Sequence, residues 1–276
     1  MSDPAQTRGF EAVSSDWTVI RGEESGSGRD IVLLHGLTAT RRYVLMGSRL
    51  LEKEGWRVIS FDARGHGKSD AAPDAGDYTY PHLVDDLRAV VAQTGATRPV
   101  LMGISMGAHT AAAACATGAV EVAALLLVTP AYMPSEEVPT DALAHWDRLS
   151  EALKENGPEG FVEEWKGGGV EPKWLDVVTR ATLQRLRQHA DLGALSDALK
   201  CVPRSQPFAS WETLNALTVP TTVVGSLDSS DPGHPLETAR KWSDELPGAD
   251  FVVEAEGESP IAWRGASLSR LVTELR

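Results

Sequence analysis

A serine flanked by two glycines is the feature of this sequence that points most clearly to chemistry. Residues 103–107 read Gly-Ile-Ser-Met-Gly, which places Ser105 in a G-x-S-x-G pattern. A short apolar run, Val100–Met102, leads into it, and the alanine-rich segment Ser105–Thr117 has helical character. Glycines make room for a tight strand-to-helix turn, which presents the serine hydroxyl at the carboxyl edge of a sheet. We therefore expect Ser105 to be a nucleophile, with the backbone N–H of Met106 facing a developing oxyanion.

The segments around Ser105 alternate between strand-like and helix-like patterns. Short apolar runs predict strands buried on both faces, and segments with helical spacing lie between them. Two short strand candidates precede the turn-rich segment Gly22–Gly28. The further predicted strands are 31–34, 57–61, 100–102, 122–128, 221–224 and 251–253, and the predicted helices include 41–53, 80–93 and 105–117. This alternation predicts an α/β fold with parallel strands, right-handed crossovers and helices on both faces of the sheet.

Strand-like runs disappear between Ala131 and about Leu214. Amphipathic helical stretches lie near residues 141–153, 158–165 and 173–189. The same region contains half of the eight tryptophans, namely Trp146, Trp165, Trp174 and Trp211. We interpret residues 131–214 as a helical lid inserted into a core made of residues 1–130 and 215–276. The tryptophans either pack a small core of the lid itself or line an apolar substrate pocket.

Three loop segments carry a resemblance to a known family. His35-Gly36-Leu37 follows the first buried strand, Asp62–Asp70 follows the second, and the turn at Ser105 follows the third. In this order they resemble the α/β-hydrolase superfamily of esterases, lactonases, acyl hydrolases and C–C bond hydrolases. The resemblance implies an eight-stranded, mostly parallel sheet and a Ser–His–acid triad whose acid precedes the histidine along the chain. It also implies that the backbone N–H of Leu37 is the second oxyanion donor.

Two aspartates compete for the acid position of such a triad. Residues 225–235 read Gly-Ser-Leu-Asp-Ser-Ser-Asp-Pro-Gly-His-Pro and resemble the acid loop of the superfamily. Asp228 stands about three residues after the glycine that closes the strand, which is the usual place of the acid. Asp231 begins an Asp-Pro turn of similar character three residues later. The resemblance favours Asp228 and leaves Asp231 as the alternative.

The histidine of the triad is where this sequence departs from the family pattern. The resemblance places it after the last strand, in a string such as Gly-His-Ser-Pro. Residues 257–260 instead read Gly-Glu-Ser-Pro, and no histidine follows His234. One interpretation makes Glu258 the general base, with its pKa raised by burial under the lid and by the carboxylate of Asp228. A second interpretation gives the role to another histidine, of which His234 is the best placed.

A third interpretation retains the oxyanion hole without hydrolysis. The protein would then bind a ligand, or support a lyase, isomerase or dehydratase step that needs only oxyanion stabilisation. The first interpretation is preferred. It predicts hydrolysis of a small ester, thioester or lactone with an apolar acyl group, through an atypical site made of Ser105, Glu258 and Asp228.

The composition of the whole chain indicates which partners, cellular location and cofactors to expect. Its 276 residues carry a formal net charge of −13, which disfavours nucleic acid and anionic membrane surfaces as partners. The N-terminus lacks a secretory-signal pattern, and no apolar run is long enough to span a bilayer. The two cysteines, Cys115 and Cys201, belong to no metal-binding motif. We therefore expect a cytoplasmic protein that uses no metal, nucleotide or flavin cofactor.

Overall fold

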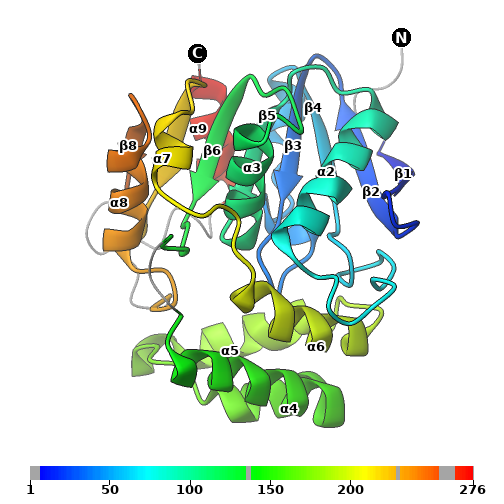
Figure 1. The fold of residues 1–276 in the computed structure, drawn as a ribbon, viewed down its shortest axis with the longest axis vertical. Coiled ribbons are helices and arrows are strands. Elements are labelled where there is room, and N and C mark those ends of the chain that lie inside the picture. Colours follow the sequence, from blue (N-terminus) through cyan, green and yellow to red (C-terminus); the bar gives the residue numbers. More distant parts are fainter. Residues whose placement is uncertain (1–6, 135–137, 228–230, 255–264, 276) are drawn as a thin grey trace.

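The computed structural model describes residues 7–134, 138–227, 231–254 and 265–275 (Figure 1). Within these ranges eight strands form one sheet in the order β1-β2-β4-β3-β5-β6-β7-β8. The strands are β1 (Arg8–Val13), β2 (Val19–Gly26), β3 (Arg29–Leu34), β4 (Trp56–Phe61), β5 (Val100–Ile104), β6 (Ala124–Val128), β7 (Thr221–Val224) and β8 (Asp250–Val252). β2 pairs antiparallel with β1 and β4, and the other neighbours pair parallel. The predicted eight-stranded, mostly parallel α/β sheet is confirmed.

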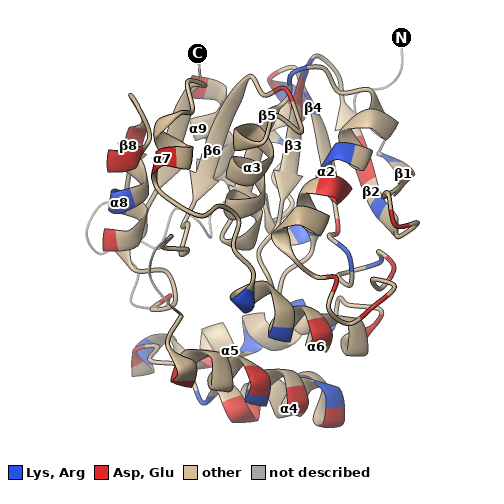
Figure 2. Ribbon diagram, in the orientation of Figure 1, with Lys and Arg blue, Asp and Glu red and all other residues tan. Residues whose placement is uncertain are grey.

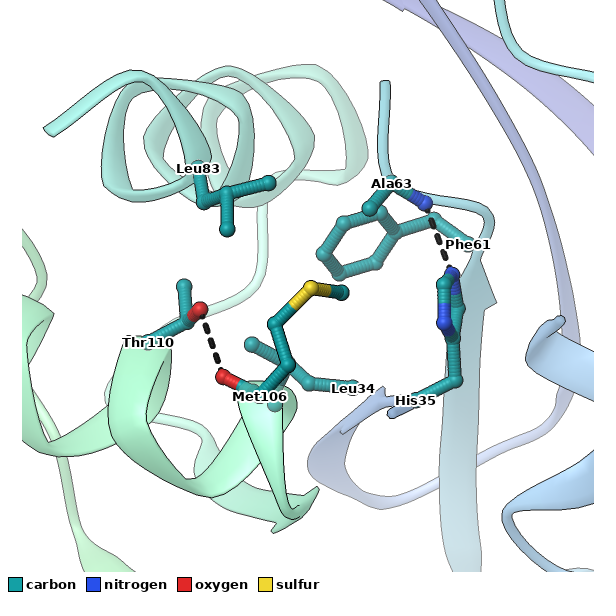
Figure 3. A pocket seen from close by; sticks show the side chains of 8 residues that line it. Leu34, His35, Phe61, Ala63, Leu83, Met106 and Thr110 are labelled. Carbon is teal, nitrogen blue, oxygen red and sulfur yellow. Dashed lines mark hydrogen bonds between the residues drawn. The ribbon is translucent and has the colours of Figure 1, made fainter. Parts of the chain in front are cut away.

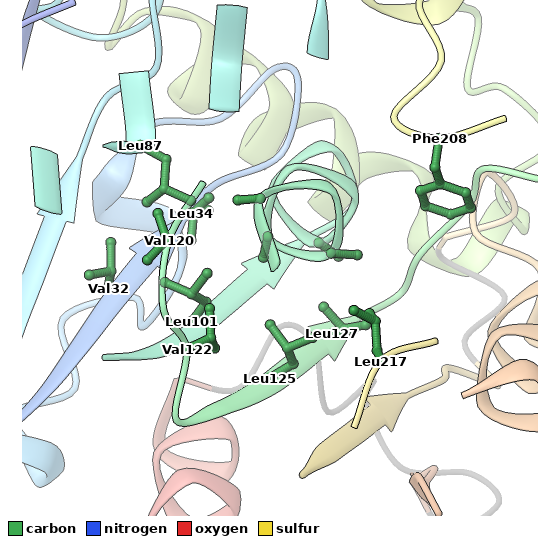
Figure 4. Close-up of a cluster of buried hydrophobic side chains, with 14 of the residues drawn as sticks. Val32, Leu34, Leu87, Leu101, Val120, Val122, Leu125, Leu127, Phe208 and Leu217 are labelled. Carbon is green, nitrogen blue, oxygen red and sulfur yellow. The ribbon is translucent and has the colours of Figure 1, made fainter. Parts of the chain in front are cut away.

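Successive residues of the central strands enter two different cores, because neighbouring side chains on a strand point to opposite faces. Val32 and Leu34 belong to one core, and Ile31 and Leu33 belong to the other. The first core packs under α2 (Tyr80–Thr94), α3 (Met106–Ala116), α7 (Glu212–Asn215) and α8 (Leu236–Glu245), as Figure 4 shows in part. The second packs under α1 (Leu50–Lys53) and α9 (Gly265–Glu274). Both faces are therefore covered, which explains the continuous apolar runs of the strands.

Three helices form a cap below the carboxyl ends of the parallel strands (Figure 1). They are α4 (Thr140–Trp165), α5 (Pro172–Leu186) and α6 (Leu192–Cys201), and α4 bends at Gly157, where φ is 68° and Pro158 follows. Their apolar residues form a cluster of their own, made of Leu149, Leu153, Phe161, Leu186, Leu195 and Leu199. Trp146 and Trp165 pack against this cluster, whereas Trp211 packs against the core of the sheet. Figure 2 shows acidic and basic residues interspersed along α4. Among the described residues, no helix is sufficiently long and apolar to cross a membrane.

Two predicted elements differ from the structure. The segment 41–53 contains a short 3₁₀ helix (η1, Arg41–Tyr43) and α1, but the chain between them turns through Met46 and Gly47, which both have positive φ. Glycine tolerates that conformation and ends a helix. The sequence predicts a turn-rich segment over Gly22–Gly28. In the structure β2 instead continues to Gly26, because it pairs with β4 over Gly22–Gly26. Pairing with a distant strand outweighed the local turn preference there.

A buried arginine fixes the loop that follows β4. Arg64 is fully buried and donates two hydrogen bonds to Asp86 of α2, from Nε at 2.8 Å and from Nη2 at 2.7 Å. Its Nη1 donates to Asp16 at 2.7 Å. A guanidinium that binds a carboxylate through two parallel hydrogen bonds is held in one orientation. This ion pair therefore joins the β1–β2 turn, the loop after β4 and α2.

We expect Arg64→Ala to be strongly destabilising, because Asp86 would keep a buried carboxylate without its cation. Removing one partner of a buried ion pair costs about 3–5 kcal/mol of unfolding free energy. For a chain of this size the melting temperature should fall by about 10 °C. Arg180→Ala is the matched control, since Arg180 is 71% exposed and pairs with the exposed Asp176. That variant should melt within about 2 °C of the wild type. Equal melting temperatures for both variants in calorimetry would contradict a structural role for Arg64.

Candidate active site

Ser105 occupies a strained turn between β5 and α3. Its φ is 51° and its ψ is −115°, a backbone conformation that non-glycine residues rarely adopt. A Cβ on Gly103 would lie 2.2 Å from the carbonyl of Gly107, and a Cβ on Gly107 would lie 2.3 Å from the Leu34 carbonyl oxygen. Only glycine fits at either position. The two glycines of the sequence pattern thus allow the turn that raises Ser105 at the carboxyl edge of the sheet.

The structure brings His234 and Asp231 to this serine. His234 Nε2 lies 2.8 Å from Ser105 Oγ, and His234 Nδ1 lies 2.8 Å from Asp231 Oδ1. The carboxylate accepts the hydrogen bond from Nδ1–H, which leaves Nε2 unprotonated and able to accept one from the Ser105 hydroxyl. The side chains of His234 and Asp231 are 24% and 17% exposed, so the imidazole remains within reach of a substrate. Serine, imidazole and carboxylate form one continuous hydrogen-bonded chain.

Histidine and acid both come from the loop that follows β7. The His234 backbone N–H donates to the Asp231 carbonyl at 3.2 Å, and this turn sets both side chains on one side three residues apart. Pro235 then precedes α8. Asp228 and Glu258, which the sequence favoured as acid and base, lie outside the described residues. The two alternatives, Asp231 and His234, are the residues that the structure places in the chain of contacts to Ser105.

Two backbone N–H groups beside Ser105 form a candidate oxyanion hole. Met106 is the first residue of α3, where backbone N–H groups have no acceptor within the helix. Gly36 passes close to the serine, since a Cβ built on it would lie 3.6 Å from Ser105 Cβ. This brings the following residue, Leu37, to the same place. Within the described ranges the N–H groups of Leu37 and Met106 donate to no protein acceptor. Both predicted donors are thus free to bind an oxyanion.

A small, mostly apolar cavity lies behind this hole (Figure 3). The side chain of Met106 points into it, together with Leu83 and Phe61. His35 borders it and accepts a hydrogen bond on Nε2 from the Ala63 backbone N–H at 2.9 Å. Its Nδ1 donates to the Gly36 carbonyl at 2.9 Å. His35 therefore ties the oxyanion loop to the loop after β4.

Comparisons with known proteins agree with this architecture. A family described as alpha/beta hydrolase fold matches residues 31–165. An esterase from Exiguobacterium antarcticum superimposes with a TM-score of 0.76 at 25% identity, covering 96% of this chain and 98% of that chain. A thermophilic esterase from Thermogutta terrifontis does so with a TM-score of 0.77 at 22% identity, covering 97% of each. This chain belongs to the α/β-hydrolase superfamily. Among sequence relatives, the AB hydrolase superfamily protein YisY of Bacillus subtilis is 38% identical over 85 residues, which is 31% of each chain.

Membership of the α/β-hydrolase superfamily clarifies the order of the three residues. The superfamily resemblance implies a serine, then an acid, then a histidine along the chain. Ser105, Asp231 and His234 keep that order, but the acid and the histidine share one loop instead of occupying two. The short string Asp-Pro-Gly-His is the sequence signal for this arrangement. A turn that reverses the chain over four residues can bring its first and last side chains into contact with each other, as it does for Asp231 and His234.

His189 joins the cap to the core of this α/β hydrolase. Its Nδ1 accepts from the Gly67 backbone N–H at 3.0 Å, so its Nε2 carries the proton and donates to the Thr38 carbonyl at 3.2 Å. His189 is 8% exposed. Burial, aided by the repulsion of His66, lowers the pKa of His189 to about 2. The neutral imidazole that both hydrogen bonds require is therefore the form that folding favours.

We expect this histidine to make folding stability depend on pH. Its folded pKa lies below the unfolded value of about 6.5, so its contribution is complete above pH 6.5 and is lost as the pH falls toward 2. One such group removes about 2 kcal/mol of unfolding free energy between pH 7 and pH 5. Between pH 7 and pH 5, the unfolding free energy of His189→Gln should therefore fall by about 2 kcal/mol less than that of the wild type. Urea titrations of both proteins at the two pH values measure this difference. Equal losses in the two proteins would show that His189 does not titrate in this way.

Proposed function

We propose that this chain hydrolyses a small carboxylic ester, thioester or lactone through an acyl-enzyme formed on Ser105. The observation that carries the proposal is the hydrogen-bonded chain from Ser105 Oγ through His234 to Asp231, with 2.8 Å at both steps. Nucleophilic serine catalysis needs a base within hydrogen-bond reach of the hydroxyl and a third group that orients the base. His234 and Asp231 meet both requirements.

In the acylation step, Ser105 Oγ attacks the carbonyl carbon while His234 Nε2 takes the hydroxyl proton. The carbonyl oxygen becomes an oxyanion, which the N–H groups of Leu37 and Met106 stabilise. The tetrahedral intermediate collapses, the bond to the leaving group breaks, and the imidazolium returns its proton to the leaving oxygen or sulfur. Asp231 holds the imidazole in the required tautomer and stabilises its charged form.

In the deacylation step, water takes the place of the leaving group. His234 Nε2 removes a proton from that water as it attacks the acyl carbon, and the same oxyanion hole serves the second intermediate. The proton then passes to Ser105 Oγ as the carboxylic acid leaves. A lactone follows the same steps, except that its leaving hydroxyl stays on the product.

An imidazole in contact with Ser105 makes a second base unnecessary. A histidine titrates near neutral pH and therefore suits proton transfer to and from serine better than a glutamate does. We therefore assign the base role to His234 in preference to Glu258, and the acid role to Asp231 in preference to Asp228. The non-hydrolytic alternative needs only the oxyanion hole and leaves the ordered imidazole without a use.

Covalent modification of Ser105 tests the proposal. The protein is assayed on a panel of 4-nitrophenyl esters, acyl thioesters and simple lactones, before and after treatment with diisopropyl fluorophosphate. We expect turnover of at least one substrate class. This turnover should be lost in proportion to the amount of a single diisopropylphosphoryl adduct, formed with release of fluoride, on the peptide that contains Ser105. Absence of turnover on the whole panel would favour the non-hydrolytic alternative. Turnover that survives complete modification of Ser105 would exclude this serine as nucleophile.

A further inference from the structure

Three buried histidines contact three successive carbonyl groups of the oxyanion loop. The pairs of ring nitrogen and carbonyl oxygen are His35 Nδ1 with Gly36 at 2.9 Å, His66 Nε2 with Leu37 at 2.6 Å, and His189 Nε2 with Thr38 at 3.2 Å. His35 follows β3, His66 lies in the loop after β4, and His189 follows α5 of the cap. A carbonyl oxygen only accepts hydrogen bonds, so the imidazoles are the donors. Three separate segments of the chain thus bind one short loop.

The three imidazole rings lie in a row, with His66 in the middle. The ring centroids of His35 and His66 are 5.1 Å apart, and those of His66 and His189 are 5.6 Å apart. All six ring nitrogens lie within hydrogen-bond distance of backbone groups. The nitrogens are therefore occupied in supporting the backbone, and none of them is available to a metal ion or a substrate.

These contacts fix both peptide groups that flank the Cα atom of Leu37. The first peptide group contains the Gly36 carbonyl and the Leu37 N–H, which point in opposite directions because the peptide is planar and trans. His35 Nδ1–H and the Ala39 backbone N–H both donate to that carbonyl, each at 2.9 Å. His66 Nε2–H donates to the carbonyl of the second peptide group. Leu37 therefore cannot rotate about φ or ψ, and its N–H cannot turn, unless one of these hydrogen bonds breaks.

His66 makes the shortest of the three contacts and is itself held firmly. Its side chain is buried, and its Nδ1 lies 2.8 Å from the carbonyl of Arg64, whose guanidinium is fixed by Asp86. Both ring nitrogens thus face carbonyl oxygens. Burial lowers the pKa of His66, and the carbonyls of Arg64 and Leu37 oppose that effect. A neutral ring with its proton on Nε2 keeps the shorter contact, which is the one to Leu37.

We propose that His66 is a positioning residue for the reaction, because it holds Leu37 where the N–H of that residue binds the oxyanion. The inference deepens the proposed hydrolase function and rests on it. His66 acts through the Leu37 backbone, so the loop meets the oxyanion and the imidazole does not. An oxyanion donor is effective only at hydrogen-bond distance from the place where the charge develops, and loss of one donor lowers kcat by about 10²- to 10³-fold. A displaced donor loses part of that contribution.

A pair of matched substrates reports on the oxyanion hole. 4-Nitrophenyl acetate and its thiono analogue share a leaving group, but the C=S sulfur is a weaker hydrogen-bond acceptor and gains less from the Leu37 N–H. Both rates come from the same folded molecules, so partial unfolding cancels from the ratio of their kcat/KM values. We expect His66→Leu to lower the ester-to-thionoester ratio by about tenfold or more, mainly through kcat for the ester. His66→Gln should restore most of the ratio, because its amide can donate to the Leu37 carbonyl.

Two further variants make the substrate test specific. His82→Leu is the same chemical change at a histidine that contacts Thr79 on α2, and it should keep the wild-type ratio. His66→Phe keeps an aromatic ring between His35 and His189 but has no donor, so it should lower the ratio as His66→Leu does, even if the leucine disturbs folding. An unchanged ratio in a folded His66→Leu or His66→Phe protein would overturn the inference. So would a ratio that His66→Gln fails to restore.

A structure determination separates this inference from the hydrolase function. Crystal structures of the wild type, His66→Leu and His66→Gln would give the position of the Leu37 N–H relative to Ser105 Oγ. We expect a displaced Leu37 peptide in His66→Leu and the wild-type position in His66→Gln. A displaced peptide in a protein without esterase activity would reject the hydrolase and retain the positioning role. Esterase activity with an unmoved Leu37 peptide in His66→Leu would do the reverse.

Discussion

Replacing His234 with alanine is expected to reduce kcat for ester hydrolysis by about 10⁴- to 10⁶-fold, the range seen when serine hydrolases lose their base. The reason is geometric. His234 Nε2 is the described base that contacts Ser105 Oγ, and without it the hydroxyl has no proton acceptor at 2.8 Å. KM should change much less, because the imidazole acts mainly in the transition state. Steady-state kinetics on a 4-nitrophenyl ester measures both constants.

Two comparison variants make the His234 result specific. Glu258→Gln removes the competing base that the sequence suggested and should keep kcat within about tenfold of the wild type. His82→Ala removes a histidine at the start of α2 that bonds to Thr79, away from Ser105, and should also stay active. Added imidazole should restore part of the turnover of His234→Ala, which a folding defect would not allow. A large loss in Glu258→Gln with an active His234→Ala would reverse the assignment.

Replacing Asp231 with asparagine is expected to lower kcat by about 10³- to 10⁴-fold. An amide can donate to His234 Nδ1, which favours the tautomer with the proton on Nε2. That tautomer cannot accept the proton of Ser105. The effect should be smaller than that of His234→Ala, because the imidazole itself is retained. Steady-state kinetics and a thermal melt of the same sample separate loss of chemistry from loss of fold.

Asp228→Asn is the natural control for Asp231, since it makes the same chemical change three residues earlier in the same loop. We expect its kcat to stay within about tenfold of the wild type, because Asp231 already holds His234 Nδ1 at 2.8 Å. If Asp228→Asn lost more activity than Asp231→Asn, the acid would be Asp228, as the usual spacing after the strand suggests.

The fold could be predicted well because its signals are local. Each central strand is a short apolar run, and the turn around Ser105 needs glycines at both sides for a steric reason that the sequence displays directly. Elements whose form depends on distant partners were less predictable. β2 continues through Gly22 to Gly26 because β4 pairs with it, and no local pattern in that segment reveals the partner. The helix α6 was not predicted, although Asp191 caps it by accepting from the Ala194 backbone N–H at 2.9 Å.

The candidate site was predictable in part. Ser105, Leu37 and Met106 follow from motifs whose backbone geometry is set by neighbouring residues. The base is different, because a histidine reaches the serine across space and its place in the sequence depends on loop shape. The family pattern directed attention to Glu258, whereas the turn from Asp231 to His234 carries the contact to Ser105.

The rate at which diisopropyl fluorophosphate modifies Ser105 tests the role of His234 most directly, because it reports activation of the serine without requiring knowledge of the substrate. Intact-mass spectrometry would give the second-order rate constant for the wild type, His234→Ala and Glu258→Gln. We expect a fall of about 10³-fold or more in His234→Ala and little change in Glu258→Gln. An unchanged rate in His234→Ala would contradict activation of Ser105 by His234.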